Sequence, residues 1–172
     1  MALQYIKELE TLIKGAMIDE LTQQGHVMTG SLLKSIQVKS TILSNKLVLE
    51  GSFFAYGRIL ENGVTAQNIP FGGSTGKKTS RYIQGLVEFV KLRRIETDNK
   101  KALGVAFAIA KTHKKEGMPT NNSFLPKFTK NGRRLDWLEF ALQNAEDAIL
   151  EKLNKIFGDD FEGGIQNLLK NI

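Results

Sequence analysis

The sequence predicts an α+β fold, in which a small antiparallel sheet packs against a long N-terminal helix and further helices. Apolar residues recur at helical spacing in residues 2–24 and again after residue 81, whereas residues 36–51 alternate as a β-hairpin does. An apolar content of 41% in 172 residues is enough for a core. We therefore expect one domain over 1–157, with a long loop at 64–80. The tail at 158–172 is expected to be a helical remnant or a mobile end.

The N-terminal helix is predicted over 2–24, and Gly25 suits the residue that follows its last turn. Thr29 is then expected to cap a short turn. The predicted core stripe of the helix consists of Leu3, Ile6, Leu9, Leu12, Ile13, Met17 and Leu21.

The hairpin is predicted from two alternating segments, Ser35–Ile42 and Lys46–Gly51, joined at Ser44-Asn45. The second segment is apolar on both faces, so a helix should cover at least one of them. The next stretch, SFFAYGRILENG, fits either a short helix that stops at Asn62-Gly63 or a strand with a bulge at Gly57. We favour the helix.

Three further helices are predicted, over 81–94, 101–116 and 135–157, with Gly117 and Gly158 as the stops of the last two. The residues expected to face inward in the first are Ile83, Leu86, Val87, Val90 and Leu92. Between the helices, 64–80 and MPTNNSFLPKFTKNGRR carry the Gly, Pro, Ser and Asn content of irregular loops.

Composition excludes several classes of function. The chain has no cysteine, which excludes disulfides, thiol catalysis and Cys-based zinc sites, and suits a reducing compartment. No apolar run approaches the roughly 20 residues of a membrane span. The first residues, MALQYIKELETLIKG, mix charged and apolar side chains, so we expect no cleaved signal and a cytosolic protein.

Charge is distributed unevenly along the chain. Residues 77–134 hold 15 Lys and Arg against 4 Asp and Glu, a net charge of +11, whereas the remainder holds 9 against 14, a net charge of −5. Three interpretations stay open: contact with a polyanion such as DNA, head-to-tail pairing of copies, and a solvated surface.

The stretch FGGSTGKKTS at 71–80 resembles a phosphate-binding loop but does not satisfy its pattern. That pattern requires Gly, four residues, then Gly-Lys-Ser/Thr. Phe71 stands where the first glycine is needed, and Lys78 stands where the hydroxyl is needed. Pro70 also argues against a central strand leading into the loop. We therefore expect a flexible basic loop and no nucleotide cofactor.

Other candidate sites are weak. His26 and His113 lie far apart and lack a partner at metal-ligand spacing, and the acidic tail at 159–162 lacks the spacing of a calcium loop. No hydrolase elbow is present, so we expect no metal and no enzyme activity. Aromatic residues near Lys127–Arg134 suit stacking on single-stranded bases, but Trp137 more simply begins a core-facing helix.

Two patterns occur in a characteristic order. TGSLLKSI follows the predicted N-terminal helix and precedes the hairpin, and FAYGRILENG follows the hairpin. A later segment, AIAKTHKKEGMPTNNSFL, joins a basic helix, a glycine stop and a Phe-Leu pair. This order resembles the head–tail joining, tail-completion (neck) and minor tail proteins of tailed bacteriophages. The matching residues are Thr29, Gly30, Leu32, Ser35, Ile36, Tyr56, Glu61 and Gly63.

The resemblance covers about residues 1–125; the loop after Gly63 is longer and more basic than the pattern, and the C-terminal helix lies outside it. It implies a structural virion protein that forms a ring at the head–tail junction or the upper end of the tail, after assembly in the host cytoplasm. Its partners would be further copies, other neck, connector and tail proteins, and DNA passing through the channel. A basic DNA-binding protein is the alternative. We predict assembly or DNA-facing contacts at Ile69, Phe71, Lys77, Lys78, Arg81, Arg93 and Arg94.

Overall fold

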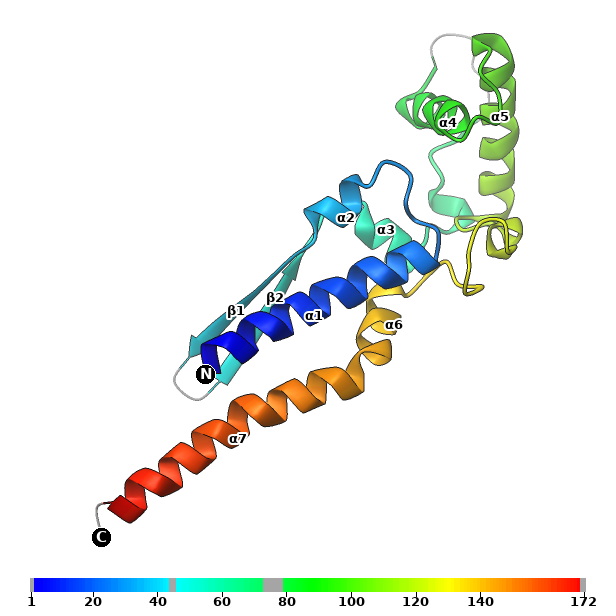
Figure 1. Ribbon diagram of the computed structural model, residues 1–172. Coiled ribbons are helices and arrows are strands. Elements are labelled where there is room, and N and C mark those ends of the chain that lie inside the picture. Colours follow the sequence, from blue (N-terminus) through cyan, green and yellow to red (C-terminus); the bar gives the residue numbers. More distant parts are fainter. Residues whose placement is uncertain (1, 44–45, 73–78, 171–172) are drawn as a thin grey trace. The chain divides into compact units, whose positions relative to one another are not determined.

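The computed structural model describes residues 2–43, 46–72 and 79–170, with side chains from Leu3 to Gly158. The helices and strands follow in the order α1 (Ala2–Gln23), α2 (Ser31–Ser35), β1 (Gln37–Leu43), β2 (Lys46–Ser52), α3 (Gly57–Asn62), η1 (Ala66–Asn68), α4 (Arg81–Leu92), α5 (Asn99–Glu116), η2 (Asn121–Phe124), α6 (Trp137–Asn144) and α7 (Glu146–Lys170) (Figure 1). The predicted α+β class, with an antiparallel hairpin and a long N-terminal helix, is confirmed.

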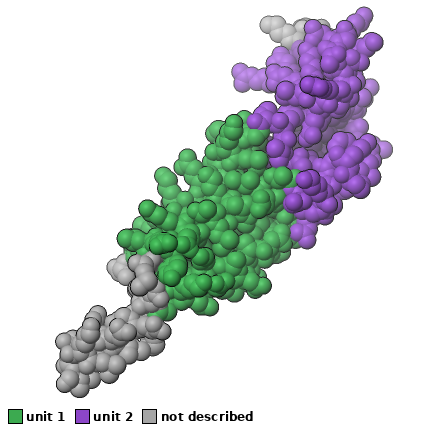
Figure 2. All heavy atoms as spheres, in the orientation of Figure 1, with its two compact units in different colours: residues 1–22, 30–57, 136–172 green, residues 23–29, 58–135 purple. Residues whose placement is uncertain are grey.

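The chain divides into two compact units (Figure 2). The first unit comprises residues 1–22, 30–57 and 136–172, and the second comprises residues 23–29 and 58–135. The first unit therefore holds most of α1, the hairpin, α6 and α7, whereas the second holds α4 and α5.

In the first unit, α1 runs alongside the β1–β2 hairpin (Figure 1). Its buried stripe, spaced at three and four residues, consists of Ile6, Leu9, Ile13, Met17 and Leu21. Two polar side chains of α1 also reach its neighbours: Glu10 accepts from Ser40 of β1, and Glu20, which is buried, accepts from Asn144 of α6 at 3.1 Å. The helix therefore joins the sheet to the C-terminal helices.

The two strands pair in antiparallel register from Gln37 opposite Ser52 to Leu43 opposite Lys46. The predicted turn at Ser44-Asn45 lies outside the described residues. Val38 and Ser40 of β1 are half-buried, while their neighbours along the strand are exposed, so the predicted alternation is visible in the first half of β1. Ile42, predicted to share the inward face, is 58% exposed.

In the second unit, α4 and α5 pack through a small apolar core. Ala102, Ala106 and Ala110 lie at intervals of four along α5 and are fully buried, which lets the two helices approach closely. Ile83 of α4 packs in this core, and Phe71, Tyr82, Leu86, Val87, Leu103 and Phe107 surround it. The hydroxyl of Tyr82 also meets Nδ1 of His113 at 2.7 Å, so one polar contact joins the same two helices.

Both helices begin at capping side chains. Ser80 accepts a hydrogen bond from the amide of Ile83, and Asp98 accepts one from the amide of Lys101. At the other end of α5, Gly117 adopts a φ of 87°, as the sequence predicted for the stop.

Several details of the sequence-based prediction are wrong. The single helix expected over 135–157 is two helices, which meet at Ala145, and α7 continues through Gly158. The break follows Asn144, whose side chain donates to Glu20 of α1, and no glycine or proline stands at this point of the sequence. Leu3 and Leu92, predicted to face the core, are 71% and 58% exposed. Gly30, rather than Thr29, is the N-cap of α2, and its φ is 71°.

Candidate functional site

The first two segments that resemble the phage family contact one another in the first unit. The hydroxyl of Ser35 accepts a hydrogen bond from the amide of Phe54 at 3.0 Å and donates one to the carbonyl of Leu32 at 2.7 Å. Tyr56 also bonds to the backbone of Leu32, although burial of its ring raises the pKa of its hydroxyl. TGSLLKSI and FAYGRILENG are therefore joined side by side at the base of the hairpin.

A buried tryptophan completes this junction. Trp137 is fully buried, as the sequence predicted, and its indole Nε1 donates to the carbonyl of Gly57 at 3.0 Å. Its ring meets the ring of Phe53 edge to face, with centroids 5.1 Å apart. Gly57 is required here, because a Cβ at this position would lie 2.6 Å from the Phe53 ring and 3.2 Å from Leu32. Leu32, Ser35 and Tyr56 of the two segments thus lie at this junction.

The second and third segments of the resemblance meet in the second unit. Gly63 has a φ of 69°, and Val64, which follows it, pairs with Met118 through two backbone hydrogen bonds of 2.7 and 2.8 Å. A Cβ at Gly63 would lie 2.5 Å from the Met118 carbonyl, and one at Gly117 would lie 2.7 Å from the Val64 carbonyl. Two glycines are therefore needed for this close approach. Glu61, two residues earlier, is half-buried in α3.

The residues predicted as assembly or DNA-facing contacts differ in how deeply they are buried. Ile69 is only 2% exposed, so its side chain packs inside the second unit. Phe71 is half-buried against the α4–α5 core, with its ring centroid 6.1 Å from that of Phe107. Lys77 and Lys78 lie outside the described residues.

The three predicted arginines are exposed. Arg81 lies in the first turn of α4, and Arg93 and Arg94 lie at its C-terminal end. Arg93 donates to the carbonyl of Gly25 at 3.4 Å, and its guanidinium lies 5.9 Å from the centre of the Phe89 ring. Arg94 has a positive φ of 53°. Of the predicted set that the structure describes, the arginines are thus the residues available on the surface.

The uneven charge of the sequence coincides with the division into units. The second unit holds 16 Lys and Arg against 5 Asp and Glu, a net charge of +11. The first unit holds 8 against 13, a net charge of −5. One compact body is therefore strongly basic and the other is acidic.

An arginine binds the backbone just after the end of α1, and the sequence alone did not identify this contact. Arg134 donates from Nη1 to the carbonyl of Gln24 at 2.6 Å and to that of Phe128 at 3.2 Å. Burial and the nearby charge of Arg93 lower its pKa. Its carbonyl lies 3.3 Å from Nε2 of His26, and burial lowers the pKa of His26 to about 4. A basic residue near a helix C-terminus is electrostatically favourable. Gln24 and Arg134 are too far apart in the sequence for their contact to be predicted from a local pattern.

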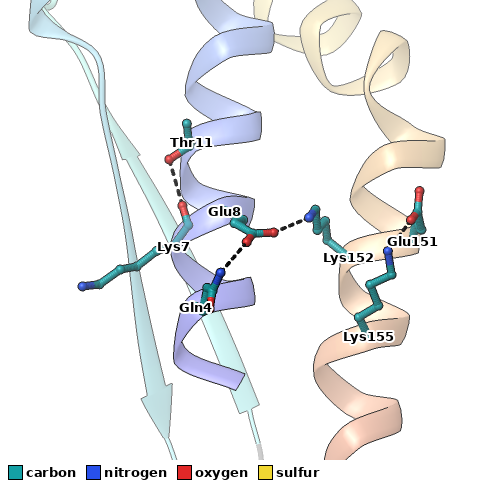
Figure 3. A network of polar contacts seen from close by, with 7 residues as sticks. All are labelled: Gln4, Lys7, Glu8, Thr11, Glu151, Lys152 and Lys155. Carbon is teal, nitrogen blue, oxygen red and sulfur yellow. Dashed lines mark hydrogen bonds and ion pairs between the residues drawn. The ribbon is translucent and has the colours of Figure 1, made fainter. Parts of the chain in front are cut away.

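A groove in the first unit is lined by residues of α1 and by Lys152 of α7. Its volume is about 740 Å³, and it is lined by Leu3, Gln4, Lys7, Glu8, Thr11, Leu12 and Lys152. Glu8 forms an ion pair with Lys152 at one wall, and this contact lowers the pKa of the Glu8 carboxyl. Figure 3 shows the pair bridging the two helices. The groove is open to solvent.

Within residues 2–43, 46–72 and 79–170, no three His, Asp or Glu side chains gather as metal ligands would. None of the helices in the same ranges combines the length and the apolar character needed to cross a membrane. Compared with known proteins, the chain matches no family model, no curated protein and no solved structure.

Proposed function

We propose that this chain is a structural protein of a tailed-phage virion, which forms an oligomeric ring at the head–tail junction or the upper end of the tail. The observation that carries the proposal is the contact between the segments that resemble the family. Ser35 joins the first segment to the second, and the pairing of Val64 with Met118 joins the second to the third. Contacts within each unit therefore hold the resembling segments together in pairs, and this is what supports the proposal.

The charges of the two units support the ring. A closed ring needs a heterologous interface, in which one surface of a copy meets a different surface of the next. The basic second unit and the acidic first unit provide such a pair of surfaces. We propose that the first unit of one copy binds the second unit of the next.

The ring is tested with the purified full chain by mass photometry and negative-stain imaging at low and high salt. Closed rings that dissociate as salt rises are expected, because exposed charges are screened within a Debye length of about 10 Å at 0.1 M salt. The double variant Arg81→Glu/Arg94→Glu, which lowers the charge of the second unit, should weaken the rings. A chain that stays monomeric at low salt would contradict the proposal.

A matched control changes the same total charge on the other unit. Lys7 and Lys14 are exposed on α1, so Lys7→Glu/Lys14→Glu makes the acidic unit more acidic. Rings of this variant should be at least as stable as those of the parent chain. If the two double variants weaken the rings equally, the attraction between unlike units is not the cause of assembly.

The loop that contains Lys77 and Lys78 is proposed to contact a neighbouring subunit or ring. Deleting residues 68–79 would remove buried Ile69, so a deletion limited to 73–78 is the cleaner test. The expected result in a phage complementation assay is a folded protein that fails to join heads to tails. Normal joining by this variant would exclude the loop as an assembly contact.

The second candidate function is DNA binding without catalysis, which the net charge of +11 on the second unit favours. Its signature is a monomer that binds duplex DNA with an affinity that falls steeply as salt rises. Fluorescence anisotropy with labelled DNA measures this, and Arg81→Glu/Arg94→Glu should reduce the salt slope. Rings that form without DNA, from a chain that binds DNA weakly, favour the virion function instead.

A further inference from the structure

The two outer edges of the hairpin differ in how they are protected. The amide of Ser40, in the middle of β1, donates to the Glu10 carboxylate at 2.7 Å, and the Ser40 hydroxyl donates to the same oxygen at 2.5 Å. Glu10 belongs to α1, so this helix places a carboxylate against the β1 edge. A carboxylate and a covering helix both prevent another strand from pairing there.

The edge of β2 has no such protection. Because the amide of Ser40 points away from β2, the alternation of an antiparallel ladder directs its partner Leu49 outward as well, together with Leu47. The sheet has two strands, and the outward backbone groups of Leu47 and Leu49 bond to no other residue among those the structure describes. Lys46 and Glu50, on either side, are exposed. This is an open edge ready to pair.

The sequence of β2 identifies the strand that fits this edge. Residues 46–50 read Lys-Leu-Val-Leu-Glu, which is self-complementary when two copies run antiparallel about Val48. Lys46 then lies opposite Glu50 of the second copy, Leu47 opposite its Leu49, and Val48 opposite its Val48. Leu47 and Leu49 are the residues with outward amides, so they form the hydrogen-bonded pairs. The Lys–Glu pairs fall at the closer, non-bonded positions, where opposite charges attract most.

We propose that β2 is an interaction surface for a second copy of this chain, through a two-fold antiparallel β2–β2 contact that makes a four-stranded sheet. The register is specific, because a shift of one step brings Lys46 opposite Ser52 and leaves Glu50 opposite Val48. In the proposed register each Glu50 lies between Lys39 of its own hairpin and Lys46 of the second copy. The contact is independent of the proposed ring, which uses unlike surfaces of the two units.

Sedimentation velocity over a wide range of concentration tests the contact. At a salt concentration that dissociates the ring, a dimer is expected, and Lys46→Glu should weaken it roughly tenfold, because the two-fold axis turns two attractive pairs into two repulsive ones. The triple variant Lys39→Glu/Lys46→Glu/Glu50→Lys exchanges all the charges around Glu50, including that of Lys39 opposite it in the same hairpin, and should restore the dimer. Lys34→Glu, the same charge change at an exposed site on α2, is the matched control and should leave the dimer unchanged.

Amide hydrogen exchange by NMR gives a second readout. The amides of Leu47 and Leu49 should become protected as concentration rises, whereas those of Val48 and Glu50, which face β1, should be protected throughout. A chain whose Leu47 and Leu49 amides stay unprotected at high concentration overturns the proposal. So does a dimer that Lys46→Glu leaves intact, or one that the triple exchange fails to restore. Dimers and larger rings differ in mass, so failure of this contact is distinct from failure of the ring.

Discussion

Ser35 precedes β1 and Phe54 follows β2, and a hydrogen bond of 3.0 Å from the Phe54 amide to the Ser35 hydroxyl joins them at the base of the hairpin. The same hydroxyl donates to the carbonyl of Leu32, so one side chain fixes the end of α2 to the chain that leaves β2. Ser35 therefore has a structural role that its place in the sequence does not reveal. Its role in the first unit is to close the base of the hairpin.

Replacing Ser35 by alanine should therefore destabilise the first unit. The loss of two hydrogen bonds, one from a backbone amide, is expected to cost about 1–2 kcal/mol in the free energy of unfolding. Urea unfolding followed by tryptophan fluorescence measures this, because the chain has a single tryptophan, Trp137, which is buried in the same unit. The control is Ser52→Ala, which removes an exposed hydroxyl from β2. Equal free energies for the two variants would show that Ser35 does not close the hairpin.

Trp137→Phe should cost more than the loss of Ser35. It removes the donor to the Gly57 carbonyl and leaves part of a fully buried side-chain volume empty, so a loss of about 2–4 kcal/mol is expected. Far-UV circular dichroism during urea unfolding gives the value, since the fluorophore is lost. Phe157→Ala on α7, where the side chain is 51% exposed, should cost less than about 1 kcal/mol. A Trp137→Phe variant as stable as the parent would contradict the packing at Gly57.

Alanine in place of a glycine should destabilise the second unit at two positions and stabilise it at a third. Gly63 and Gly117 have positive φ, and a Cβ at either would lie within 2.7 Å of a backbone carbonyl, so alanine should cost about 2 kcal/mol or more. Gly104 lies inside α5, where a Cβ would meet nothing within 4 Å. Gly104→Ala should therefore stabilise the same unit by about 0.5–1 kcal/mol. Amide hydrogen exchange in α4 and α5 measures both changes in the free energy of unfolding. Destabilisation by Gly104→Ala would contradict the empty space found around a Cβ at this position.

The elements with a clear period were predictable from the sequence. The spacing of Ile6, Leu9 and Ile13 identified α1, and the alternation around Val38 identified the hairpin, because burial on one face imposes these periods directly. Gly117 and Gly63 were predicted as stops since few other residues adopt positive φ. The break at Ala145 was not predicted, because the helical spacing of Leu142, Ala145 and Ile149 continues across it.

The candidate site was less predictable than the fold. The sequence identified Ser35, Tyr56 and Gly63 as a pattern, but which residues they contact depends on tertiary structure. Ile69 illustrates the limit: an isoleucine in a loop reads equally well as a surface contact or as a core anchor, and it is the latter. Arg134 was counted among the basic residues of the middle, whereas its guanidinium binds the backbone at the end of α1. Long-range pairings of this kind leave no periodic trace.

The second unit should lose stability as the pH falls from about 6.5 to about 4. Burial beside Arg134 lowers the pKa of His26 to about 4, whereas an unfolded histidine titrates near 6.5. Between these values the unfolded chain binds a proton that the folded chain does not, so acidification favours unfolding. His113 contributes a pH dependence of the same sign, because burial against Tyr82 lowers its pKa as well.

The variant His26→Gln keeps a donor for the Arg134 carbonyl but has no titrating group. It should reduce the loss of unfolding free energy between these pH values by on the order of 1–2 kcal/mol. The measurement is the free energy of exchange of α4 and α5 amides at several pH values, with His113→Gln compared alongside. If the parent and His26→Gln lose stability in parallel down to pH 4, the buried neutral state assigned to His26 is wrong.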